Sequence, residues 1–151
     1  EAASEAFKVA SLRHLNLEKL NAGRDVLDEV TFRRARHVIT ENERVLSFVA
    51  ALKLGDFAQC GELMVQSHAS MRDDFEISVD ELDTAVETSL RHGAIGARMT
   101  GGGFGGAAIA LCPIEKISDL TNSVYAEFDL LGYAKPDIFT VNAADGAMRL
   151  I

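Results

Sequence analysis

The sequence predicts an α+β domain in which an antiparallel sheet packs against several helices. Apolar residues recur at three- and four-residue spacing through the first half of the chain. Short segments with almost no charge, bounded by glycine and proline, then take over. Helices followed by strand, loop, strand, helix and two strands are typical of this class. The 151 residues, 48% hydrophobic and 25% charged, fit one domain spanning residues 1–151.

A long helix is expected from about Leu27 to Leu54, followed by a second helix. Gly55 suits the left-handed position that ends a helix, and Asp56 with Gln59 forms a pair of the capping-box type for the next one. The second helix ends in the charged turn at residues 72–76. The apolar stripe of the long helix comprises Val30, Phe32, Ala35, Val38, Ile39, Val45, Leu46, Val49 and Leu52.

A third helix, in "ISVDELDTAVETSLRHG", has the clearest start and stop signals. Ser78 and Glu81 have the spacing of a capping box, and Ile77 and Leu82 occupy the two positions of a hydrophobic staple. Gly93 ends the pattern. Three helices are therefore expected before the first strand.

The pattern changes from helical to extended after Gly93. Two strands are expected around a glycine loop, then a helix, and then two closing strands around the turn "ADG". Their ranges are 96–100 and 107–111 for the first strands, 117–132 for the helix, and 137–143 and 147–151 for the closing strands.

The loop between the first two strands is very rich in glycine: five of its six residues, 101–106, are glycine. Each glycine costs roughly 0.5–1 kcal/mol inside regular structure, so the backbone there is needed without side chains. A Walker loop is excluded because no Lys-Ser/Thr follows. Gly101, Gly103 and Gly106 match GxGxxG, but a strand and not a helix comes next, which excludes a dinucleotide fingerprint. A ligand-contacting loop and a tight hairpin packed under a helix remain.

The charge balance argues against nucleic acid or an anionic membrane as the main partner, because the net charge is −8. The one basic cluster, residues 33–37, is interpreted as a solvated or salt-bridged helix face near Glu29, Glu41 and Glu43, or as a contact with a partner domain. No apolar run has the ~18 residues that a membrane span needs, and no signal peptide is recognised. Cys60 and Cys112 fit reduced thiols of an intracellular protein. The chain opens without Met, in a helical pattern, which suggests a fragment.

Two histidines have neighbours of catalytic or metal-binding type. His68 follows Ser67 and precedes two aspartates, but neighbours on one helix cannot converge as a catalytic triad does, so a packed helix end near a domain interface is expected. His37 and Glu41 are four residues apart and lack a third metal ligand. They are therefore expected to form a side-chain pair on the helix surface.

The glycine loop and several other segments resemble one known family. "GARMTGGGFGG" (96–106) resembles the third motif of the GHMP kinase superfamily, in the form found in galactokinases. Ala107 stands where many galactokinases have Cys, and "SVDELD" replaces a Ser-Cys-Pro-Glu-Leu-Asp run. The other segments that resemble the galactokinase C-terminal region are 32–45, 52–78, 81–83 and 144–150.

The resemblance implies an ATP-dependent kinase that phosphorylates the C1 hydroxyl of α-D-galactose with Mg²⁺, in the cytoplasm. It also implies two domains with the active site between them, and the N-terminal kinase domain as partner of this chain. The chain holds neither a catalytic base nor a metal ligand under this reading, and it binds neither ATP nor Mg²⁺ tightly alone. The residues implied to line the ATP and sugar cleft are Thr100, Gly101, Gly102, Gly103, Phe104, Gly105 and Gly106, with Arg98 beside them.

Several alternatives stay open. Arg98 either faces the cleft or forms a structural ion pair, and Thr100 either caps the loop or reaches a phosphate. The family's sugar-contacting residues belong to motifs that this chain lacks, so N-acetylgalactosamine or arabinose kinases remain possible relatives. A non-catalytic galactose-sensing or interaction domain is the alternative of a different class.

Overall fold

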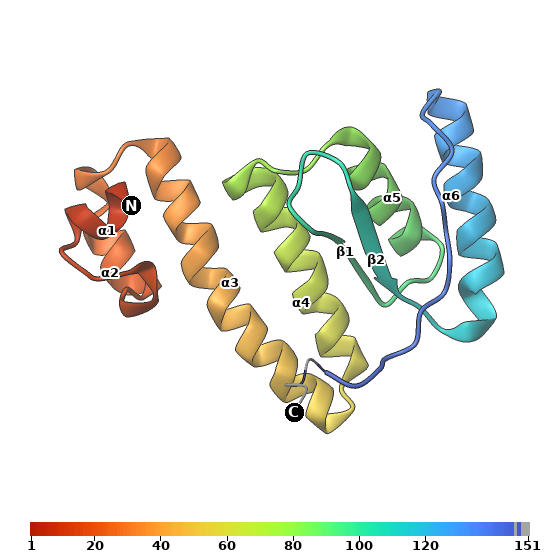
Figure 1. Ribbon diagram of the computed structural model, residues 1–151, viewed down its shortest axis with the longest axis horizontal. Helices are drawn as coiled ribbons and strands as arrows, with labels where there is room; N and C mark the ends of the chain where they lie inside the picture. The colour runs from red at the N-terminus through yellow and green to blue at the C-terminus, as the bar shows by residue number, and fades with distance from the viewer. Residues whose placement is uncertain (147, 149–151) are drawn as a thin grey trace.

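The computed structural model describes residues 1–146 and 148 and has the predicted α+β architecture (Figure 1). Helices precede a β-hairpin, and one more helix follows it. Helices α1 (Ala2–Ala6), α2 (Leu17–Ala22), α3 (Glu29–Leu54), α4 (Phe57–Ser70), α5 (Asp80–Arg91) and α6 (Ile117–Leu131) accompany strands β1 (Gly96–Thr100) and β2 (Ala107–Leu111). Four short turns complete the list: η1 (Leu12–His14), η2 (Arg24–Val26), the π-helical η3 (Met71–Phe75) and η4 (Ile114–Lys116).

The two strands pair antiparallel and pack against α4 and α5. The register sets Gly96 opposite Leu111 and Thr100 opposite Ala107. Helix α3 packs on the other side of α4, and α6 packs on α5 (Figure 1). Helix α4 and β1 approach each other closely because Gly61 on the helix meets Gly96 on the strand without side chains between them.

Local start and stop signals explain most helix ends. Gly55 adopts a left-handed φ of 70° after α3, and the side chain of Asp56 accepts a hydrogen bond from the Gln59 amide at 3.0 Å. The prediction of a capping box at the third helix is wrong, because α5 begins at Asp80 and its N-cap residue is therefore Val79 and not Ser78. The hydroxyl of Ser78 instead donates to the carboxylate of Asp83 at 2.5 Å, a charge-assisted bond.

Twelve of the buried apolar residues form three clusters. The first lies between α1, α2 and the N-terminal half of α3, the second under the hairpin, and the third between α5 and α6. Their buried members are Ala3, Leu15, Leu20, Phe32, Ala35 and Ile39; Met71, Leu82 and Met99; and Leu120, Val124 and Phe128.

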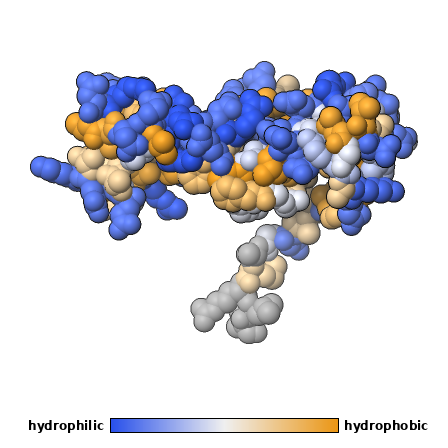
Figure 2. Space-filling model, turned by 90° about the horizontal axis from the view of Figure 1, so that it is seen from above, coloured by the Kyte–Doolittle hydropathy of each residue, from blue (hydrophilic) through white to orange (hydrophobic). Residues whose placement is uncertain are grey.

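The apolar stripe of α3 is buried only in its N-terminal half. Phe32, Ala35 and Ile39 are buried, whereas Val45 and Leu46 are 52% and 72% exposed. Hydrophobic residues also stand in patches among hydrophilic ones on the face shown in Figure 2. Spacing alone predicts an amphipathic helix but does not say how much of its stripe finds a partner.

The basic cluster on α3 forms a salt-bridged face, but with different acids from those expected. Arg33 and Arg34 both pair with Glu76, at 2.9 and 2.7 Å, and Arg36 pairs with Asp74. These contacts join α3 to η3 and the residue after it, about forty positions away in the sequence.

The predicted strand at residues 137–143 does not form. No backbone hydrogen bond joins residues 134–146 to another segment within the described chain, and Phe139 and Val141 are each 73% exposed. A strand needs a paired neighbour, and the hairpin does not supply one here. The other predicted closing strand, 147–151, lies outside the described residues except for Met148. Among the described helices, none is both long and apolar enough to cross a membrane.

Candidate functional site: the glycine loop

The glycine loop, residues 101–106, connects β1 to β2 at the closed end of the hairpin, next to the Thr100–Ala107 pair. Four of its glycines have positive φ, from 84° to 116°, a region that residues with side chains rarely adopt. A Cβ atom would meet nothing within 4 Å at Gly101, Gly102 or Gly105. Most of the loop therefore presents bare backbone to its surroundings.

The loop is fastened at its middle to the residues before α5. The Phe104 amide donates to the Ile77 carbonyl at 2.7 Å, and a Cβ on Gly103 would come within 2.7 Å of Ile77. Phe104 itself has a φ of 58°, which costs about 1–2 kcal/mol for a residue with a side chain. Its ring is 75% exposed, so this strained residue is not held by burial of its side chain.

Arg98, on the strand that enters the loop, forms an ion pair inside the chain. Its Nη1 lies 3.1 Å from Oε1 of Glu41 on α3. Burial alone would raise the pKa of Glu41, but hydrogen bonds from Ser67 and Arg44, and the charges of Arg44 and Arg98, hold it below its usual 4.5. Glu41 thus stays ionised, and Arg98 has an ion-pair partner on α3 within this chain.

Glu41 and His37 do not form the surface pair that their spacing predicts. His37 is buried, its Nδ1 lies 3.0 Å from Ser70 Oγ, and its ring stacks on Phe75. Burial lowers the pKa of His37 below 6.5. Helix-to-helix packing turns both side chains toward α4 and η3, which residue spacing on one helix cannot reveal.

His68 is buried against the strand that enters the loop. Its Nδ1 accepts a hydrogen bond from the Met99 amide at 3.2 Å, and its Nε2 lies 3.2 Å from Asp83 Oδ1. The expected packing of this helix end is therefore directed at β1. The contacts of Asp83 with His68 and of the Ile77 carbonyl with the loop could not be predicted from the sequence. They join residues in different elements, and no local sequence pattern reveals such pairs.

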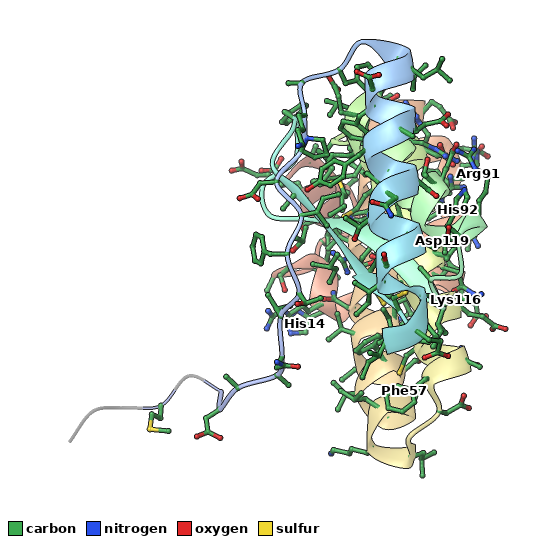
Figure 3. The ribbon with its side chains drawn as sticks, turned by 90° about the vertical axis from the view of Figure 1, so that its right-hand side faces the viewer. His14, Phe57, Arg91, His92, Lys116 and Asp119 are labelled. Atoms are coloured by element: carbon green, nitrogen blue, oxygen red, sulfur yellow. The ribbon has the colours of Figure 1, made fainter. Side chains whose placement is uncertain are left out.

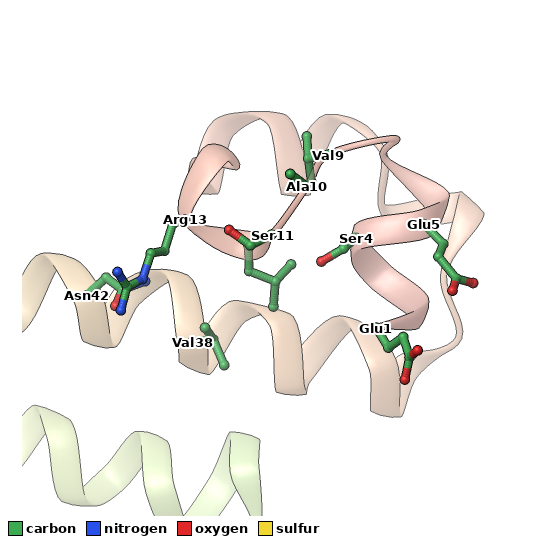
Figure 4. A pocket seen from close by; sticks show the side chains of 10 residues that line it. Glu1, Ser4, Glu5, Val9, Ala10, Ser11, Arg13, Val38 and Asn42 are labelled. Carbon is green, nitrogen blue, oxygen red and sulfur yellow. The ribbon is translucent and has the colours of Figure 1, made fainter.

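Two hollows on the surface of the described chain lie away from the loop. One of about 630 Å³ lies beside α1, η1 and α3, where Arg13 points toward Asn42 (Figure 4). The other, about 260 Å³, is lined by residues of α6 and the segment after it. Neither includes a residue of the loop. The described residues also contain no group of three or more His, Cys, Asp or Glu side chains arranged to hold a metal ion.

The arrangement of the site suits binding better than acid–base chemistry. Exposed backbone amides can approach the oxygens of an anionic or polar group closely when no side chain intervenes. The nearby titratable groups are occupied, because Glu41 is paired with arginines and His68 binds a backbone amide.

Comparison with known proteins gives two curated relatives with high similarity. The chain is 46% identical over 147 residues to the galactokinase of Mycobacterium tuberculosis (strain ATCC 25618 / H37Rv), covering 97% of this chain and 40% of that protein. It is 42% identical over 151 residues to the galactokinase of Mannheimia succiniciproducens, covering 97% and 39%. The chain thus spans about 40% of the length of the curated relatives it matches.

Two solved structures of kinases are similar to this chain in fold. The fold matches Lactococcus lactis galactokinase complexed with galactose, with a TM-score of 0.83, 38% identity, and coverage of 87% of this chain and 36% of that one. L. major mevalonate kinase in complex with R-mevalonate matches with a TM-score of 0.52, 26% identity, and coverage of 80% and 35%. The family model for the C terminal of GHMP kinases matches residues 48–129, from the end of α3 to α6 and including the whole glycine loop. Since that match covers more than half of the chain, the chain belongs to the GHMP kinase C-terminal family.

Proposed function

We propose that this chain is the C-terminal part of a galactokinase, which transfers the γ-phosphoryl group of ATP to O1 of α-D-galactose. The observation that carries the proposal is the similarity to galactokinases, 46% identity over 97% of the chain. The loop at 101–106 supports it, because phosphoryl transfer depends mostly on positioning and charge neutralisation. Backbone amides without side chains suit that task.

The loop and its flanking Thr100 and Arg98 are the proposed contribution to the ATP and sugar cleft. The exposed amides around Gly101, Gly102 and Gly105 fit phosphate or sugar oxygens in their donor chemistry. Mg²⁺ fits poorly, since the described residues offer no cluster of carboxylates to hold it. We assign no metal ligand and no catalytic base to this chain, and derive no step through the ion.

The proposed partner is an N-terminal kinase domain that supplies the remaining motifs, with residues 1–151 forming a single C-terminal domain. The coverage of about 40% of each relative supports this division. The two free cysteines, Cys60 and Cys112, fit a reducing cytoplasm.

A chimera tests the proposal. This chain replaces the matching segment of the Mannheimia succiniciproducens galactokinase, and ATP-dependent galactose phosphorylation is measured for the chimera and for the chain alone. We expect activity in the chimera only. A folded chimera without activity would overturn the proposal, and activity of the isolated chain would overturn the division of labour between domains.

A loop variant of the chimera tests the role of the backbone. Gly103→Val brings a side chain against Ile77 at a φ of 84° and should lower phosphoryl transfer about 100-fold by displacing the loop. Gly146→Ala is the matched control, because Gly146 lies outside the loop, its φ is not positive and its Cβ would meet nothing within 4 Å. Unchanged turnover in Gly103→Val would show that the loop only connects the two strands and has no part in phosphoryl transfer.

A further inference from the structure

The edge of β1 that faces away from β2 is held by a histidine. The Met99 amide donates to Nδ1 of His68 on α4, and both residues are buried, with exposed fractions of 0% and 4%. A buried amide without a partner is strongly unfavourable, so this bond fixes the ring to the strand. Met99 is one residue before Thr100, from which the glycine loop departs.

Asp83 on α5 faces the other nitrogen of the same ring. A ring that accepts at Nδ1 and is neutral carries its proton on Nε2, which lies 3.2 Å from Asp83 Oδ1. The alignment falls short of a good hydrogen bond, so Asp83 acts on the ring mainly through its charge. Burial lowers the pKa of His68, although Asp83 opposes this. Asp83 is itself fixed by the hydroxyl of Ser78.

The same short segment holds the glycine loop at a second point. Ile77, next to Ser78, accepts the hydrogen bond from the Phe104 amide and leaves Gly103 no room for a side chain. Residues 77–83 therefore contact the loop directly at its middle and, through His68, at the strand that enters it. A shift of this segment would displace both ends of residues 99–104 together.

We propose that His68, oriented by Asp83, is a positioning residue for the glycine loop. The ring fixes the position of β1 along α4. It thereby sets the direction in which the backbone amides of residues 101–106 point. The claim about position concerns this chain alone. Its consequence for catalysis rests on the proposed function, because only a loop that contacts substrate makes loop position matter for turnover.

The first test is ¹⁵N NMR of the 151-residue chain. We expect the His68 ring to be neutral with its proton on Nε2, and the Met99 amide to show a hydrogen-bond coupling to Nδ1. A proton on Nδ1 of His68 would overturn the proposal at once. No kinase activity enters this measurement, so its failure is separate from a failure of the proposed function.

The second test compares Asp83→Leu with Asp83→Asn by amide hydrogen exchange. Asp83→Leu should speed exchange at Met99 and Phe104 about tenfold, while amides of α6 stay unchanged. Asp83→Asn removes the charge but keeps the size and polarity of the side chain, so it should speed exchange at Met99 and Phe104 less than Asp83→Leu but measurably above the unaltered chain. Equal acceleration throughout the chain, or none at Met99, would contradict a positioning role. If Asp83→Leu does not fold, the comparison of Asp83→Asn with the unaltered chain decides, with a smaller acceleration at Met99 expected.

The chain offers a matched control in a second histidine–carboxylate pair. His92 and Asp119 lie side by side on the surface, as Figure 3 shows, with Nδ1 3.4 Å from Oδ2. Asp119→Leu removes the carboxylate partner of a histidine at the C-terminal end of α5, the end opposite to Asp83, and should leave exchange at Met99 and Phe104 unaltered. In the active chimera, Asp83→Leu should lower kcat about 10- to 100-fold, and Asp119→Leu should not.

Discussion

Replacing Gly61 by alanine should destabilise the protein, although the same change stabilises most helices. Gly61 lies inside α4, where alanine normally gains about 1 kcal/mol over glycine. At this position, however, a Cβ atom would stand 2.1 Å from the Ile95 carbonyl oxygen, and the next atoms are also backbone or β-carbon branches of Ile95. No side-chain rotation can relieve that contact.

The size of the effect follows from the distance that must be recovered. An ordinary contact of this kind is 3.4–4 Å, so α4 and β1 must separate by about 1 Å. Overpacking of this order lowers the free energy of unfolding by about 3 kcal/mol. The higher helix propensity of alanine offsets about 1 kcal/mol of that loss. The net loss of about 2 kcal/mol corresponds to a fall in Tm of roughly 4–8 °C for a domain of this length.

Thermal unfolding of the purified chain, followed by circular dichroism, measures the change. Glu62→Ala provides the control, because Glu62 is the exposed neighbour of Gly61 in the same helix and its replacement should alter stability by less than about 0.5 kcal/mol. A Tm for Gly61→Ala that is equal to or above that of the unaltered chain would refute the close approach of α4 and β1.

Two further predictions concern the core and the buried histidines. Leu82→Ala empties part of the cluster under the hairpin and should cost about 2–5 kcal/mol in urea unfolding; a Tm shift near zero would contradict its burial. Burial holds the pKa of His37 and of His68 below 6.5 in the folded chain. The unfolded chain therefore binds more protons than the folded chain just below pH 6.5, and the free energy of unfolding should fall as the pH decreases through that window. The urea midpoint should accordingly be lower at about pH 5.5 than at about pH 7.5, and an unchanged or higher midpoint would contradict neutral buried rings.

Features coded by neighbouring residues could be predicted from the sequence, and features that need a distant partner could not. Gly55 and Asp56 signal a helix end and start through their own backbone and side chain, and the structure confirms both. The hairpin around residues 101–106 follows likewise from composition and period. The resemblance of that loop to the GHMP third motif was also readable from eleven adjacent residues.

The errors have a common physical origin. Ser78 has the spacing of a capping residue, but a carboxylate five positions later competes for its hydroxyl. The spacing predicts Glu41 beside His37, yet the partners of Glu41 are Arg44, Ser67 and Arg98, the last of them 57 positions away. The strand at 137–143 has suitable residues but no neighbour to pair with in the described chain. In each case the outcome depends on a partner group that the local spacing pattern does not include.

The segment at residues 137–143, which has no backbone partner among the described residues, has a consequence for handling the protein in solution. Its exposed Phe139 and Val141, with backbone groups that pair with nothing in the described part of the chain, form a template on which a second chain can add a strand. The net charge of −8 works against such contacts by mutual repulsion between chains. Salt screens that repulsion, so dilute protein in buffer of low ionic strength is the favourable condition for the experiments described above.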